Sequence, residues 1–199
     1  MARPKATETP APERMQEAFW RLLERKPYAQ ITISDITRES GLNRSAFYYH
    51  YADIPELADD AIAAIYERPE VAAFIAHIIR RDSDIGTMRE YAMRYVADAS
   101  SRTSLHRLSL IVGSHGSAGL TAQLKGYLRT IWLSIIGVDP ERLDTGQLIV
   151  VEFVSSGIIG LIGRAPTLFT PEGIDALACS ALSDTVSRLI SSLRKDNTD

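Results

Sequence analysis

The sequence is poor in cysteine and histidine, and it lacks the spacings of metal sites and catalytic nucleophiles. Cys179 is the single cysteine among 199 residues, so an internal disulfide is impossible. None of the four histidines stands at H-E-x-x-H spacing, and no G-x-S-x-G occurs. Gly157, Gly160 and Gly163 lie inside a helical pattern with no strand before them, which argues against a phosphate loop. We therefore expect no metal, no cofactor and no enzymatic activity.

Long apolar runs are also missing. The longest, Leu148 to Ile162, is shorter than the roughly 20 residues of a membrane span and contains Glu152. The first 14 residues lack the apolar core of a signal peptide. Apolar residues make up 45% of the chain and charged residues 24%, as in ordinary globular proteins. We expect a soluble, cytoplasmic protein without a membrane partner.

An excess of basic residues is absent as well. The formal net charge is −3, although residues 1–53 carry eight Lys/Arg against seven Asp/Glu. A DNA-binding protein needs a local basic face rather than a basic whole. Charge therefore neither excludes nor supports a nucleic-acid partner.

Helical periodicity dominates what is present, which predicts an all-α fold. A first helix opens at Pro10–Pro12 and stops before Pro27. Thr32 with Asp35 begins a second, which ends at Gly41. Asn43 caps a third over 44–51, and Asp53 with Glu56 caps a fourth. Longer helices are expected at 70–81, 86–100, 103–112, 119–136, 141–164 and 171–194.

The informative segment is residues 32–51, where two short helices meet at Gly41. The turn is too short for antiparallel packing, so the helices cross steeply as a helix-turn-helix. In such motifs the N-terminal residues of the second helix enter the major groove. The shared apolar interior consists of Ile33, Ile36, Leu42 and Phe47.

Residues 12–60 resemble the N-terminal domain of the TetR (tetracycline-repressor) family. The run Phe47–Tyr51 is the most specific part of the resemblance. Thr37 and Pro27 depart from the family's usual alanine and glycine, and Ile54 replaces a lysine that grips a phosphate. Loss of that contact predicts generally weaker DNA binding. The matching residues are Thr32, Ile33, Ile36, Gly41, Leu42, Phe47, Tyr48, His50 and Leu57.

The resemblance implies that Thr32, Tyr48 and His50 approach the phosphate backbone of DNA. The base-edge or groove-facing candidates are Arg44, Ser45, Ala46 and Tyr49. The alternative for Tyr48 and Tyr51 is core packing, which we favour for Tyr51.

One helix-turn-helix makes few base contacts, so specific binding usually requires two copies one DNA turn apart. The resemblance implies a four-helix homodimer interface built by the last two helices, and interior packing of a monomer is the alternative. The interface candidates are Phe153, Gly157, Gly160, Leu161, Ala178, Leu182, Val186 and Leu189.

The resemblance further implies a small-molecule pocket among the middle helices, where binding shifts the DNA-competent population. Each candidate lining residue has plain core packing as its alternative. These residues are Tyr91, Tyr95, His106, Trp132 and Phe153.

Together these patterns predict a DNA-binding domain over 1–60 and a helical effector-binding and dimerisation domain over 61–199. The expected function is sequence-specific regulation of transcription through operator DNA, as a repressor released by an effector. The alternative is an all-helical ligand-binding or interaction protein with a degenerate helix-turn-helix. The missing lysine at position 54 and the acidic net charge motivate that alternative.

Overall fold

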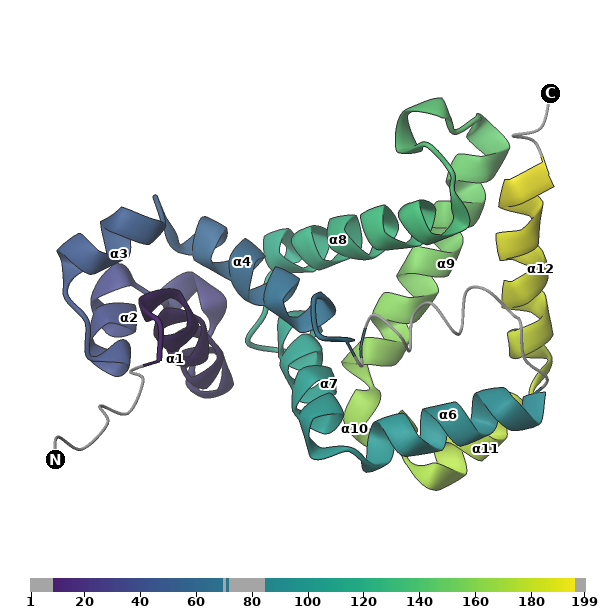
Figure 1. Cartoon of the computed structure of the whole chain (residues 1–199), viewed down its shortest axis with the longest axis horizontal. Coiled ribbons are helices and arrows are strands. Elements are labelled where there is room, and N and C mark those ends of the chain that lie inside the picture. Colours follow the sequence, from purple (N-terminus) through teal and green to yellow (C-terminus); the bar gives the residue numbers. More distant parts are fainter. Residues whose placement is uncertain (1–8, 70, 72–84, 196–199) are drawn as a thin grey trace, which may run out of the picture.

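The computed structural model describes residues 9–69, 71 and 85–195, and the regular structure of this part is entirely helical (Figure 1). This confirms the all-α prediction. Apart from Val71, the helix expected over 70–81 lies outside the described residues.

The N-terminal helices surround one apolar core. They are α1 (Ala11–Arg25), the 3-10 turn η1 (Tyr28–Gln30), α2 (Ile33–Ser40), α3 (Arg44–His50) and α4 (Ile54–Tyr66). Met15, Phe19, Ile36, Phe47 and Leu57 have no exposed surface. Each of the four α-helices therefore contributes at least one large side chain to this core.

Local capping sets the ends of these helices, as the sequence predicts. The Thr32 hydroxyl accepts from the Asp35 amide at 3.2 Å, and the Asp35 carboxylate accepts from the Thr32 amide at 3.0 Å. Gly41 closes α2 in the left-handed conformation, with φ of 67°. Asn43 caps α3 by accepting from the Ala46 amide at 2.8 Å. Asp53 caps α4 in the same manner.

The remaining helices follow the expected order with different limits. They are α6 (Ile85–Ala97), α7 (Ala99–Val112), α8 (Ala118–Ile136), η2 (Pro140–Arg142), α9 (Thr145–Gly163), α10 (Ala165–Leu168), α11 (Pro171–Ala178) and α12 (Ala181–Lys195).

Four of the expected helices had wrong limits. Asp98 caps α7, so one helix ends at Ala97 and the next begins four residues before the expected start at 103. Asp144 caps α9, so the helix expected from 141 starts at Thr145. The continuous helix expected over 171–194 breaks at 179–180, where Ala178 ends α11.

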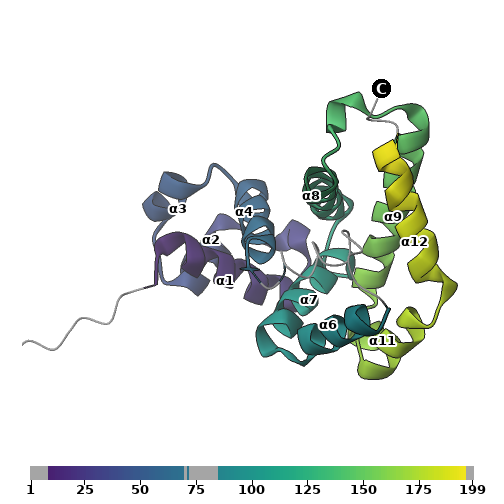
Figure 2. The same cartoon turned by 45° about the vertical axis from the view of Figure 1, so that its right-hand side comes forward.

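The helix-turn-helix lies at one end of the molecule, and α9 and α12 lie at the other (Figures 1 and 2). Helix α4 joins the two ends, because it packs against α1 and also against α8. The domain boundary proposed after residue 60 falls inside α4, and it stays a prediction.

Helix α9 is long and apolar enough, by length and composition alone, to cross a membrane. The core helix of a soluble protein meets the same criterion. In the fold α9 packs against α7, α8 and α12, and a third of its apolar stretch is buried, at 33%.

Candidate nucleic-acid interface

Helix α3 divides into a buried and an exposed face. Phe47 has no exposed surface and Tyr51 is also buried, whereas Tyr48 is 59% exposed and Tyr49 is 84% exposed. Arg44 and Ser45 are exposed as well, and Ala46 and His50 are half-buried. The structure therefore brings the candidate DNA-contacting residues of α3 to one surface, with the apolar anchors beneath them.

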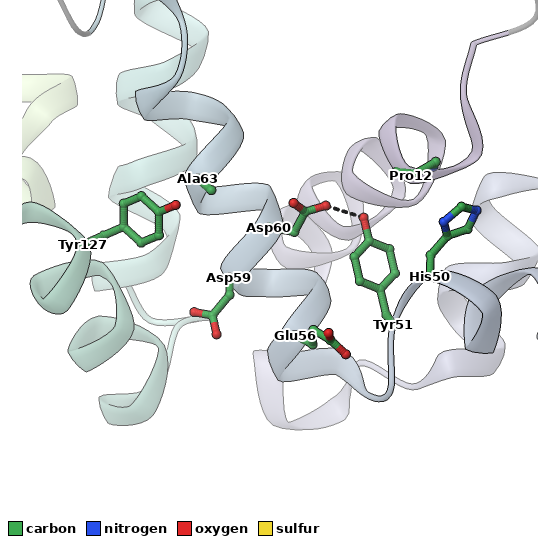
Figure 3. Close-up of a pocket in the computed structure, with 8 residues that line it drawn as sticks. All are labelled: Pro12, His50, Tyr51, Glu56, Asp59, Asp60, Ala63 and Tyr127. Atoms are coloured by element: carbon green, nitrogen blue, oxygen red, sulfur yellow. Dashed lines mark hydrogen bonds between the residues drawn. The ribbon is translucent and has the colours of Figure 1, made fainter. Parts of the chain in front are cut away.

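Tyr51 belongs to the core rather than to this surface. Its hydroxyl donates to the Asp60 carboxylate at 2.5 Å, which ties the end of α3 to α4 (Figure 3). Burial, and then the Asp60 carboxylate, raise the pKa of Tyr51, so the phenol stays protonated.

Two carboxylates of α2 neutralise four cations of the N-terminal helices. Lys26 and Arg38 pair with Asp35 at 2.5 and 2.6 Å. The pKa of Asp35 is held well below its usual range, first by the hydrogen bond from Lys26 and then by that from Thr32. The second carboxylate is Glu39, which pairs with Arg21 at 2.9 Å and Arg25 at 2.6 Å. The positive electrostatic potential of the N-terminal helices is therefore weaker than their number of lysines and arginines suggests.

Thr32 is exposed at the start of α2, but its donors face inward along the helix. Its hydroxyl donates to the Asp35 carboxylate at 2.7 Å, and its amide donates to the same oxygen. A phosphate at this position would meet the free amides of the next residues rather than the Thr32 hydroxyl.

Ile54, which stands where the resemblance predicts a lysine, is half-buried and packs against the N-terminal core. Ile54 therefore adds apolar burial at the start of α4 and places no positive charge there.

The candidate ligand-binding residues differ in burial and in the apolar clusters that they join. Tyr95 and Trp132 are buried, but Trp132 packs with Val154 in a separate cluster. Tyr91 is half-buried, with the Arg94 guanidinium 5.3 Å from its ring centre. The remaining two, His106 and Phe153, are exposed. Their role in ligand binding stays a prediction.

Sequence reasoning missed a surface pocket of about 420 Å³ between the N-terminal helices and α8 (Figure 3). Its character is acidic, because Glu56, Asp59 and Asp60 line it together with Tyr51 and Tyr127. Burial, followed by the charges of neighbouring carboxylates, raises the pKa of Asp59. Among the described residues, no three His, Cys, Asp or Glu side chains are placed to hold a metal ion.

Sequence reasoning also missed Tyr66, at the inner end of α4. Tyr66 is 5% exposed, and its hydroxyl has no hydrogen-bond partner among the residues that the structure describes. Its ring stacks on Tyr127 of α8, with centres 5.8 Å apart and planes inclined by 16°. Burial raises the pKa of Tyr66, and Tyr95 adds a smaller contribution.

The loop between α7 and α8 holds α1 and η1, a contact for which the sequence carries no local signal. The His115 ring donates from Nδ1 to the Leu23 carbonyl at 2.9 Å, and the Tyr28 amide donates to the His115 carbonyl at 2.7 Å. Arg107 of α7 pairs with Glu17 of α1 at 2.6 Å.

His106 adds to the same contact, because its Nε2 lies 3.0 Å from the Glu24 carboxylate of α1. Both histidines thus join α1 to α7 and to the loop that follows α7.

The candidate interface residues fall on α9 and α12, which pack together, and on α11, where Ala178 is the last residue. Phe153, Gly157, Gly160 and Leu182 are exposed, and Leu161, Val186 and Leu189 are half-buried. The side chain of Ala178 lies outside those described.

Comparison with known proteins concerns the N-terminal residues. Residues 17–61 match the family model of bacterial regulatory proteins, tetR family, which is a family of regulators and not of enzymes. An uncharacterized HTH-type transcriptional regulator of Bacillus subtilis (strain 168), YxbF, is 51% identical over 51 residues. That match spans 25% of this chain and only 13% of the relative.

Among solved structures, the TetR family repressor AlkX from Dietzia sp. strain DQ12-45-1b is 18% identical. The alignment covers 96% of this chain and 100% of that one, with a TM-score of 0.46. The likeness is distant, so the assignment depends on the N-terminal match. Residues 17–61 form a helix-turn-helix DNA-binding domain of the tetR family of bacterial regulatory proteins.

Proposed function

We propose that this protein is a homodimeric transcriptional repressor that binds double-stranded operator DNA and is released by a small-molecule effector. The observation that carries the proposal is the division of α3. Phe47 anchors the helix in the core while Tyr48 and Tyr49 project into solvent at 59% and 84% exposure. Two adjacent exposed tyrosines on a seven-residue helix suit a nucleic-acid surface, because their hydroxyls can reach phosphates and their rings can reach base edges.

In this proposal Tyr48 and His50 contact the phosphate backbone, together with the amides at the start of α2. Arg44, Ser45, Ala46 and Tyr49 face the major groove. Since Asp35 and Glu39 already neutralise four cations, few phosphate contacts remain, and the salt dependence of binding should be moderate.

An exposed stripe on α9 supports the dimer. Ile149, Phe153, Gly157 and Gly160 recur at helical spacing on one face, and the two large side chains are 64% and 65% exposed. A Cβ at Gly157 or Gly160 would meet nothing within 4 Å, so a partner helix has room to approach there. Leu182 of α12 adds a further exposed apolar side chain.

The buried hydroxyl of Tyr66 supports an effector site between α4 and α8. A buried polar group without a partner costs about 1–3 kcal/mol, so such groups usually bind water or a ligand. Tyr66 remains a protonated donor, and Tyr95 and Tyr127 lie beside it. The effector would then be a molecule with a flat apolar body and a hydrogen-bond acceptor.

Fluorescence anisotropy with the DNA that flanks the protein's own gene tests the proposal. We expect sequence-selective binding to a two-fold symmetric site, with affinity that falls as salt rises. Arg44→Ala should abolish selective binding and leave the dimer intact. A wild-type dimer that binds no DNA even at low salt would contradict the proposal and favour an interaction protein instead.

A further inference from the structure

A hydrogen bond joins the first turns of α2 and α3. Nη2 of Arg44, the first residue of α3, donates to Oγ of Ser34, the second residue of α2, at 2.6 Å. Arg44 is exposed and Ser34 is half-buried. The bond therefore fixes an exposed cation at the place where both helices begin.

The partner of Arg44 differs in kind from the partners of neighbouring cations. Arg21 and Arg25 bind the carboxylate of Glu39, which neutralises their charge. Arg44 binds a neutral hydroxyl, so this bond orients the guanidinium and leaves its charge available. A guanidinium has five N–H donors, and Ser34 engages one of them.

From this arrangement we propose that Ser34 positions Arg44 to recognise a guanine in each half of the DNA site. The inference rests on the proposed DNA binding. Two parallel N–H groups of an arginine match the O6 and N7 acceptors of guanine, and that match requires a fixed orientation of the guanidinium plane. Ser34 supplies this constraint before DNA arrives, which reduces the side-chain entropy that Arg44 loses on binding.

A phosphate is the other possible partner for Arg44, but the structure favours a base. The first residues of the second helix are those that meet base edges in a helix-turn-helix. A phosphate accepts hydrogen bonds over many orientations, so it needs no second side chain to hold the arginine. The hydroxyl of Ser34 accepts one hydrogen bond from Arg44, which leaves the other N–H donors of the guanidinium for a base.

The test begins with sites selected by the wild-type protein from randomised duplex DNA. Dissociation constants are then measured for the selected site and for copies in which one guanine is replaced by 7-deazaguanine, which lacks the N7 acceptor. We expect wild type to lose about tenfold in affinity at one guanine of each half-site, the size of one good base contact. Ser34→Ala should reduce this discrimination to about threefold or less, and Ser34→Thr, which keeps the hydroxyl, should restore it.

A double-mutant cycle separates positioning from a general structural role. In an Arg44→Lys background, adding Ser34→Ala should change discrimination no further, because the two residues act as one unit. The slope of affinity against salt should be the same for Ser34→Ala and wild type, since no phosphate contact is removed. Circular dichroism checks that each variant folds.

Three outcomes would overturn the proposal. In the first, Ser34→Ala keeps full discrimination; in the second, it weakens binding to all sites equally. In the third, Arg44→Lys leaves base preference intact while changing the salt slope, which would place Arg44 on a phosphate. If wild type selects no DNA at all, the proposed function itself fails, and that result is distinct from the other three.

Discussion

Placing a charge on the exposed stripe of α9 should separate the dimer. Phe153 is 65% exposed in the single chain, and we expect a partner to cover that surface. Full burial of a phenylalanine side chain contributes about 1.5–3 kcal/mol, so the exposed share is worth about 1–2 kcal/mol. A two-fold symmetric interface contains the residue twice, which gives about 2–4 kcal/mol per dimer. Phe153→Glu should therefore raise the dimer dissociation constant by at least about thirtyfold.

Sedimentation velocity over a range of protein concentrations measures this change directly. Leu168→Glu is the matched control, because Leu168 is an exposed apolar residue, at 37%, on α10 rather than on the stripe. It should leave the dimer intact. Affinity for a two-fold DNA site should fall with Phe153→Glu, since one protein copy contacts only half of the site. If Phe153→Glu dimerises as tightly as wild type while both variants are folded, the α9 interface is wrong.

Three other perturbations test the fold that carries the site. Because the fold lowers the pKa of Asp35, the ionised carboxylate stabilises the domain at pH values above the ordinary carboxyl pKa, and this stabilisation is lost as pH falls. Asp35→Asn should lower the free energy of unfolding by about 1–2 kcal/mol near neutrality and make it less dependent on pH in the acid range, as measured by urea titrations. Gly116→Ala should destabilise by about 1–3 kcal/mol in the same assay, because a Cβ there lies 1.8 Å from the Ile111 carbonyl oxygen, whereas Gly126→Ala on α8 meets nothing and should be neutral or stabilising. Arg107→Met removes the ion pair to α1 and should split the calorimetric unfolding into two transitions; a single unchanged peak would contradict this.

Helix ends were predictable wherever the signal is local. Thr32, Asn43 and Asp53 all cap helices as expected, because each bond joins residues three apart. Asp98 and Asp144 cap by the same geometry, so their signals were present in the sequence, although the helices expected over 86–100 and 141–164 ran through them. The break at 179–180 has no proline or glycine to announce it.

The two faces of α3 were predictable for the same reason. Helical spacing from Phe47 places Tyr51 on the buried face and Tyr48 away from it, as the structure shows. The neutralisation of nearby cations was not predictable, since Glu39 meets Arg21 across 18 residues of chain. Such pairs depend on how α1 and α2 pack, and periodicity says nothing of that packing.

Contacts between the N-terminal helices and the rest of the chain were the least predictable from the sequence. From the sequence, His106 is a candidate pocket residue. In the structure its ring lies beside the carboxylate of Glu24, 82 residues away. A histidine on a partly polar helix gives the same sequence pattern whether it lines a pocket or pairs with a carboxylate. The packing of α7 against α1 places His106 beside Glu24, and the ligand-binding role of His106 stays a prediction.

That packing constrains how an effector could act on DNA binding. The helix-turn-helix is attached to the rest of the chain by α4, which carries Tyr66, and separately by the bonds of His115 to Leu23 and Tyr28. A ligand that moves α4 against α8 must therefore either break the His115 contact or carry α1 along with α4. In the first case the backbone amide of Tyr28 loses its acceptor and should exchange its hydrogen faster on ligand binding; in the second its exchange stays slow and α1 moves as a rigid part of the domain. Hydrogen exchange at this one amide thus separates a hinge within the domain from a rotation of the whole domain.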